Sequence, residues 1–157
     1  MSHDVGVKFL GSFFGLGLAP FAPGTFGTLG GVLLGWLALE IEPGAPTQTY
    51  LGVAFVVVFG IGIVLGNRAT TDWGTKDPGG FVIDEVAGYL VALFLLPLHE
   101  KPWLVLGGAF VAFRLFDITK PPPCRRAEFA PAGTGIMLDD VIAGIYANLV
   151  MQVVVRL

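Results

Sequence analysis

Long apolar runs without a single charged residue are the feature that most limits how this chain can fold. Five such runs follow one another, separated by glycine, proline or polar residues. They lack the alternating pattern of half-buried strands, and several are longer than an ordinary strand, so each predicts a helix. The five runs are 29–39, 50–66, 86–98, 103–113 and 141–155.

A shortage of charge accompanies these runs. Charged residues make up 13% of the chain, about half the share in a typical soluble domain. The net charge of −3 argues against a nucleic-acid partner. We therefore predict an all-α fold with one domain over residues 1–157: a compact bundle of about five main helices, embedded in a membrane, with its active site at one end. A soluble helical domain with an unusually apolar core is the alternative.

The acidic residues are expected to gather at one end of this bundle. Helices joined by short connections pack as antiparallel neighbours, and the helix starts and ends then bring seven of the twelve carboxylates together. Six basic residues fall at the same end and two at the other, which the positive-inside rule interprets as a cytoplasmic face. The seven acids are Asp72, Asp77, Asp84, Glu85, Asp117, Asp139 and Asp140.

Two segments share one pattern, in which an acidic pair leads into an apolar helix with an Ala-Gly step one turn later. They read DEVAG at 84–88 and DDVIAG at 139–144. The glycine permits close approach of another helix. One acidic pair is explained by the helix dipole alone, but two clustered pairs repel each other and are costly to desolvate. We therefore expect a cation between them, and oxygen ligands without histidine or thiolate favour Mg²⁺.

Three alternating charges lie three residues apart at the end of another predicted helix, namely Arg114, Asp117 and Lys120. They form either a surface ion-pair ladder, which contributes little, or part of a phosphate site. In the second case Lys120 neutralises phosphate oxygens, and Asp117 is a metal ligand or a base. The loop 20–28 runs into the first predicted helix, where backbone N–H groups suit an anion, although an ordinary helix cap also explains Thr25 and Thr28.

The sequence lacks the residues that phosphatases with a covalent intermediate require. Cys124 has alanine rather than arginine six positions later, so the loop of a cysteine phosphatase is absent. The two histidines, His3 and His99, fall at opposite extremes of the expected arrangement. Hydrolysis would therefore need metal-activated water rather than a covalent intermediate.

Four stretches resemble the phosphatidylglycerophosphatase A family and occur in the family's order. They are APGTFGT at 22–28, KDPGGFVIDEVAG at 76–88, FRLFDITKP at 113–121 and GTGIMLDDVIAG at 133–144. The resemblance implies an all-α, membrane-associated bacterial phosphatase that depends on Mg²⁺ and converts phosphatidylglycerophosphate to phosphatidylglycerol. Thr28 stands where the family usually has serine, which keeps the hydroxyl.

The resemblance also implies roles for individual residues. The expected Mg²⁺ ligands are Asp84, Glu85, Asp139, Asp140 and Asp77. The expected catalytic residues are Asp117, Lys120, Asp84 and Asp140. The expected substrate-binding residues are Gly24, Thr25, Gly27, Thr28 and Lys120.

The expected partners are a phospholipid substrate and the membrane, with the active site on the cytoplasmic side of the bacterial inner membrane. Two other functions stay open. One is a small membrane carrier or subunit that binds a cation or proton through its carboxylates, which would have to lie near the bilayer midplane. The other is a soluble phosphatase of the same fold with a non-lipid substrate.

Overall fold

The computed structural model describes residues 3–41, 47–72, 79–127 and 129–157. Within these ranges the chain is helical and contains no strand, as the apolar runs predict. The elements are α1 (His3–Gly11), the 3₁₀ helix η1 (Leu16–Leu18), α2 (Pro23–Leu37), α3 (Thr47–Asp72), α4 (Ile83–Ala92), α5 (Pro102–Thr119), α6 (Cys124–Ala127) and α7 (Ala132–Val154).

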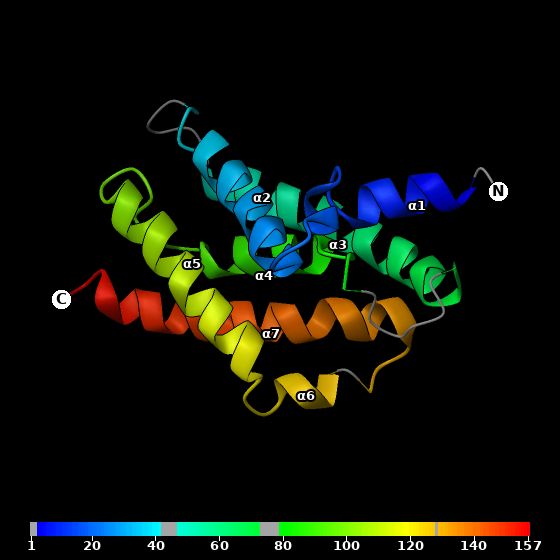
Figure 1. Ribbon diagram of the computed structural model, residues 1–157. Coiled ribbons are helices and arrows are strands. Elements are labelled where there is room, and N and C mark those ends of the chain that lie inside the picture. The colour runs from blue at the N-terminus through cyan, green and yellow to red at the C-terminus, as the bar shows by residue number, and fades with distance from the viewer. Residues whose placement is uncertain (1–2, 42–46, 73–78, 128) are drawn as a thin grey trace.

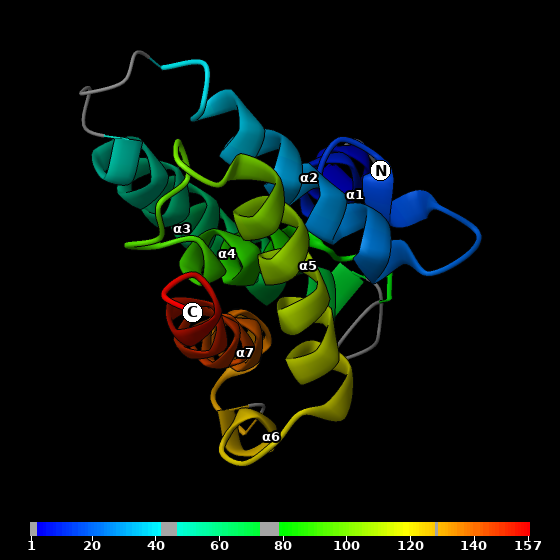
Figure 2. The ribbon, with the colours of Figure 1, turned by 90° about the vertical axis from the view of Figure 1, so that its left-hand side faces the viewer.

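Helix α4 is the central element of the bundle. Helices α2, α3, α5 and α7 all pack against it (Figures 1 and 2). Nine of its ten residues are buried, the exception being Glu85. A helix that is apolar nearly all round must be covered on every side, and α4 accordingly lies at the centre of the core.

The chain direction alternates as predicted. The start of α2, the start of α4, the end of α5 and the first half of α7 lie toward the same end of the bundle, whereas the end of α2, the start of α3 and the α4–α5 connection lie at the other (Figure 1). The predicted charged end is therefore confirmed for the residues that the structure describes. Asp77 lies outside the described residues.

Helix α2 packs on α4 through a stripe of glycines four residues apart. A Cβ atom added to Gly27 would lie 2.5 Å from the Cβ of Val82, and one added to Gly31 would lie 2.8 Å from Cδ1 of Tyr89. Contacts this short are not available to a real side chain, so the two backbones approach more closely than any larger residue allows.

Several helix boundaries differ from the predicted ones. Helix α2 begins at Pro23, because proline fits the first turn of a helix, and most of the expected loop 20–28 is therefore helical. Helix α7 begins at Ala132, two turns before its acidic pair, and the backbone N–H of Gly133 donates to Oδ1 of Asn67 at 2.9 Å. The prediction that the last helix starts with the acids is wrong.

Helix α4 is shorter than the run 86–98 because α7 supplies caps for its end. The side-chain amide of Asn148 donates to the carbonyl oxygens of Ala92 and Phe94 at 3.1 and 2.6 Å. Gln152 donates to the same Phe94 oxygen at 3.2 Å. Carbonyls at a helix end lack partners within the helix, so these amides let α4 stop inside an apolar environment.

Three helices are long and apolar enough to cross a membrane, at Thr47–Ala69, Pro102–Thr119 and Gly133–Val154. In each of the first two of these helices, only 28% of the most apolar segment is buried inside the protein. Most of their apolar side chains therefore face outward, Val53 and Val56 of α3 among them. Water is a poor environment for such a surface, and the fold is compatible with a membrane protein.

Candidate active site

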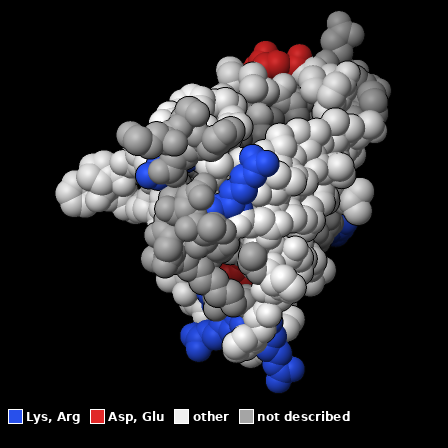
Figure 3. Space-filling view, turned by 90° about the vertical axis from the view of Figure 1, so that its right-hand side faces the viewer, with Lys and Arg blue, Asp and Glu red and all other residues white. Residues whose placement is uncertain are grey.

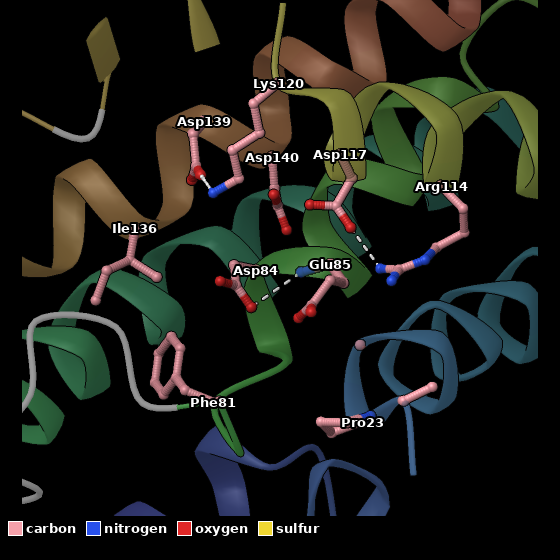
Figure 4. A pocket seen from close by; sticks show the side chains of 13 residues that line it. Pro23, Phe81, Asp84, Glu85, Arg114, Asp117, Lys120, Ile136, Asp139 and Asp140 are labelled. Carbon is pink, nitrogen blue, oxygen red and sulfur yellow. Dashed lines mark hydrogen bonds and ion pairs between the residues drawn. The ribbon is translucent and has the colours of Figure 1, made fainter. Parts of the chain in front are cut away.

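A cavity of about 490 Å³ opens where α2, α4, α5 and α7 meet (Figure 4). It is the most polar region of an otherwise apolar bundle. Seven charged side chains line it, together with residues 22–24 of α2 and its N-terminal flank. The charged residues are Asp84, Glu85, Arg114, Asp117, Lys120, Asp139 and Asp140.

The crossing of α4 and α7 brings two of the acidic segments together. A Cβ atom on Gly88 would lie 2.5 Å from the backbone oxygen of Asp140, and one on Gly144 would lie 2.1 Å from that of Gly88. The two helices therefore touch backbone to backbone at the Ala-Gly steps of the repeated pattern, as predicted. Each acid four residues before its glycine lies on the same helix face, so Asp84 and Asp140 meet just beyond the crossing.

Three carboxylates converge at this point. Asp84, Glu85 and Asp140 each offer an oxygen, and the three oxygens lie within 4.8 Å of one another. Asp84 and Asp140 are buried, and the backbone N–H of Glu85 donates to Oδ1 of Asp84 at 3.1 Å. Oxygen ligands at this density suit a hard divalent cation.

Glu85 shows most directly that the cluster lacks compensation from the protein itself. Its Oε2 is buried and finds no hydrogen-bond partner among the residues that the structure describes. Burial, together with the nearby charge of Asp117, raises the pKa of Glu85 to about 7. A buried acceptor without a partner is costly, and a bound cation is the group that would satisfy it.

The remaining charges of the cavity form ion pairs. Nζ of Lys120 lies 2.7 Å from Oδ2 of Asp139, and Arg114 donates to Asp117 within α5 (Figure 4). Lys120 caps the end of α5 in the left-handed region, with φ of 43°. Consecutive helical residues point about 100° apart. Asp139 therefore faces the end of α5, while Asp140 faces the acids of α4.

The start of α2 forms another wall of the cavity. A Cβ atom on Gly24 would lie 2.5 Å from Oε1 of Glu85 and 2.9 Å from Nη1 of Arg114. The positive end of the helix dipole therefore lies beside the carboxylates. The absence of a side chain at Gly24 therefore lets the helix backbone approach the ends of two charged side chains directly.

Most of the predicted site residues line the cavity, but three do not. Gly24, Asp84, Glu85, Asp117, Lys120, Asp139 and Asp140 meet there, whereas Thr25, Gly27 and Thr28 lie outside its lining. Gly27 packs on Val82. The buried hydroxyl of Thr28 donates to the backbone oxygen of Gly24 at 2.8 Å, so it stabilises the first turn of α2.

Two kinds of lining residue were not assigned a role from the sequence. Arg114 stood out only as part of an ion-pair ladder, yet it lines the cavity and contacts Asp117. The spacing of three residues between Arg114 and Asp117 was the sequence signal that could have identified this contact. Phe81 and Ile136 form an apolar side of the cavity, and no charge pattern marks them.

Basic side chains surround the opening. Figure 3 views this end of the molecule and shows Lys and Arg side chains spread around a recessed acidic patch. Arg68 of α3 and Arg125 and Arg126 of α6 are exposed. Exposed basic side chains at this end therefore lie near a recessed acidic cavity, an arrangement that attracts anionic molecules.

Comparisons with known proteins agree on one family. The family model described as phosphatidylglycerophosphatase A matches residues 9–155. A phosphatidylglycerophosphatase A of Haemophilus influenzae is 39% identical over 144 residues, covering 88% of this chain and 82% of the relative. That of Escherichia coli is 37% identical over 135 residues, covering 84% and 73%.

A third relative carries a different substrate in its name. A Bacteroides thetaiotaomicron protein with the provisional name phosphatidylinositol-3-phosphatase is 37% identical over 145 residues, covering 92% of this chain and 90% of the relative. No solved structure gives a significant match.

Proposed function

The chain belongs to the phosphatidylglycerophosphatase A family and is a phosphatase, and from this premise we propose that it hydrolyses phosphatidylglycerophosphate with the aid of Mg²⁺. The products would be phosphatidylglycerol and inorganic phosphate. The observation that carries the proposal is the convergence of Asp84, Glu85 and Asp140 within 4.8 Å, with a buried Glu85 oxygen that has no partner among the described residues.

We assign Asp84, Glu85 and Asp140 as the residues that hold the metal. When bound, Mg²⁺ supplies Lewis-acid polarisation of the phosphoryl oxygens and acidifies the attacking water. The donor set supports this choice, because three carboxylates without histidine or thiolate suit a hard cation. Asp139 is predicted as a further ligand, but its contact with Lys120 supports a second role in holding that ammonium in place.

The two cations of the cavity suit the phosphate group of the substrate. Lys120 and Arg114 line the same cavity as the three acids and are partly buried, so their charges are only partly screened by solvent. They would neutralise the charge that develops on the transferring oxygens. Asp117, held by Arg114, would accept the proton of the attacking water.

The location of the cavity supports a substrate that stays in the bilayer. We propose that the acyl chains remain in the inner membrane while the headgroup reaches the cavity from the cytoplasmic side. The exposed Arg68, Arg125 and Arg126 near this end support a cytoplasmic orientation. Asp84, Glu85 and Asp117 lie near helix ends, which favours the enzyme over a carrier with acids at the midplane, although Asp139 and Asp140 lie two turns inside α7.

One experiment tests substrate and metal together. Phosphate release is measured from phosphatidylglycerophosphate, phosphatidic acid and phosphatidylinositol 3-phosphate with purified protein, in Mg²⁺, in EDTA, and in EDTA followed by excess Mg²⁺. We expect phosphatidylglycerophosphate to be the best substrate, EDTA to stop release and Mg²⁺ to restore it. Preference for phosphatidylinositol 3-phosphate would overturn the substrate assignment and agree with the name of the Bacteroides relative. Activity that survives EDTA would overturn the metal role.

A matched pair of variants distinguishes the effect of losing a carboxylate of the cluster from the effect of losing a carboxylate elsewhere. Asp84→Asn should remove nearly all Mg²⁺-dependent release while the protein still folds. Glu100→Gln neutralises an exposed acid at the opposite end of the bundle and should release phosphate at the wild-type rate. Equal loss in both variants would show that the cluster has no special role.

A further inference from the structure

We propose that the groove between α2 and α5 binds one acyl chain of the phospholipid substrate and thereby holds its headgroup over the acidic cavity. This inference rests on the proposed function, because only a lipid substrate has such a chain. The groove has a volume of about 470 Å³ and its lining is apolar. Its principal residues are Leu29, Leu33 and Trp36 of α2 and Trp103, Leu106 and Phe110 of α5.

The two helices run side by side in opposite directions. At the cavity end, a Cβ atom on Gly24 would lie 2.9 Å from Nη1 of Arg114. At the other end, one on Gly35 would lie 3.0 Å from Cδ2 of Leu106. At the level of this second contact, the hydroxyl of Tyr89 on α4 donates to the backbone oxygen of Leu106 at 2.8 Å and fixes α5 to the central helix. The groove is therefore a feature of the folded core.

The groove leads into the active-site cavity. On α5, Leu106, Phe110 and Arg114 follow one another at four-residue spacing and so lie on one face of the helix. Phe110 lines the groove, and Arg114, one turn later, lines the cavity. On α2, Leu29 lines the groove and Gly24, less than two turns earlier but on another face of the helix, lines the cavity, so the continuity runs along α5. The apolar groove therefore ends near a cation and a helix N-terminus, both of which suit a phosphate group.

The distance from the cavity to the far end of the groove suits one acyl chain. Twelve residues separate Gly24 from Trp36, which corresponds to about 18 Å of helix. One leaflet of a bilayer contributes about 15 Å of hydrocarbon. Trp36 and Leu33 are 42% and 51% exposed, so substantial apolar surface is left for a chain to cover.

The neighbouring groove between α5 and α7 lacks this relationship. It is lined by Val111, Leu115, Val150 and Val154, among others. Val150 lies ten residues beyond Asp140 on α7, which corresponds to about 15 Å along the helix. Its α7 wall is therefore remote from the acids, whereas both walls of the α2–α5 groove come within two turns of a residue that lines the cavity.

Substrates of different chain length test the proposal. Wild type, Leu33→Trp and the control Val56→Trp are assayed in mixed micelles with long-chain and with dihexanoyl phosphatidylglycerophosphate. Val56 lies on α3, is 66% exposed and is outside the lining of the groove. Displacing about two methylenes should raise the KM of Leu33→Trp for the long-chain substrate about tenfold. The kcat/KM of Leu33→Trp for the short-chain substrate should stay at the wild-type value. For Val56→Trp, KM for the long-chain substrate and kcat/KM for the short-chain substrate should both stay at wild-type values.

Each other outcome is decisive. Equal loss on both chain lengths, no loss on either, or the same loss in Val56→Trp would overturn the groove. A wild-type protein that releases phosphate from neither substrate would instead contradict the proposed function. In that case, a phosphatidylglycerophosphate with a diazirine at mid-chain still tests the groove. Cross-links should map to 29–36 and 103–110 and disappear with unlabelled lipid, and cross-links elsewhere would overturn it.

Discussion

A Cβ atom on Gly144 would lie 2.1 Å from the backbone oxygen of Gly88, so α4 and α7 cross with no side chain between them. Each glycine follows an acid of the cluster by four residues, Asp84 in one helix and Asp140 in the other. Residues four apart share a helix face. The crossing therefore brings the proposed metal ligands together, and its tightness sets the distance between their oxygens.

Substituting Gly144 with alanine should disrupt the site from a distance. The added methyl group must push α7 away from α4, which costs about 1–3 kcal/mol in overpacking and separates Asp140 from Asp84. We expect a lower thermal midpoint in detergent and a loss of at least tenfold in Mg²⁺-dependent phosphate release. The control is Gly60→Ala on α3, where a Cβ meets no described atom within 4 Å. Wild-type activity in Gly144→Ala would show that the crossing does not set the geometry of the cluster.

Asp140→Asn should make the metal-free protein more stable and the Mg²⁺-bound protein inactive. Asp140 is buried beside Asp84 and Glu85, so neutralising it relieves repulsion worth about 1–3 kcal/mol when no cation is present. The measurement is the thermal midpoint in EDTA and in Mg²⁺. We expect a higher midpoint than wild type in EDTA and a smaller increase on adding Mg²⁺. A lower midpoint in EDTA would mean that the three acids do not repel one another.

Gly24→Ala should reduce activity without a comparable loss of stability. The new methyl group would meet the flexible end of Glu85 at 2.5 Å, and this side chain can move away at little cost to the fold. Moving it displaces a proposed metal ligand, so kcat/KM should fall at least tenfold, as misplaced catalytic groups are costly. The control is Gly52→Ala, where a Cβ meets no described atom within 4 Å. A parallel loss of thermal midpoint and activity would instead assign Gly24 a packing role like that of Gly27.

The repeated acidic pattern explains why the site could be located from the sequence. An acid and a glycine four residues apart encode both a ligand and a close crossing on one helix face, and this spacing is independent of the helix boundaries. The pattern therefore predicts the cluster of Asp84, Glu85 and Asp140, although the predicted start of α7 was two turns too late. The alternating helix directions follow from the short connections for the same reason.

The partner of each polar side chain could not be predicted in this way. Asp139 and Asp140 are adjacent acids, yet one contacts Lys120 and the other meets the α4 acids, because this depends on the rotation of α7 about its axis. The glycines of α2 present the same difficulty. Gly24 and Gly27 occupy one short motif, but one borders the cavity and the other packs on Val82.

Membrane orientation can be tested by thiol labelling. The native Cys124 is buried, and burial raises the pKa of its thiol, so it should react slowly with a membrane-impermeant maleimide. Cysteines introduced singly as Arg126→Cys and Glu100→Cys place an exposed thiol at either end of the bundle. We expect Arg126→Cys to be labelled in inverted inner-membrane vesicles and Glu100→Cys in spheroplasts. The reverse pattern would place the active site outside the cytoplasm.

Lys120 offers a way to separate charge from backbone conformation. Its φ of 43° is easy for glycine and strained for alanine, so Lys120→Gly removes the ammonium and keeps the turn that ends α5. A charged hydrogen bond to phosphate contributes about 1.5–3 kcal/mol, which corresponds to a loss of roughly 10- to 100-fold in kcat/KM. Lys120→Gly should show this loss with a thermal midpoint at or above that of wild type, because glycine relieves the strain, whereas Lys120→Ala keeps the strain and should have a lower midpoint than Lys120→Gly. If the ammonium serves only to pair Asp139, kcat/KM for the short-chain lipid will fall less than tenfold in Lys120→Gly. That result would leave Arg114 as the residue that neutralises the phosphate.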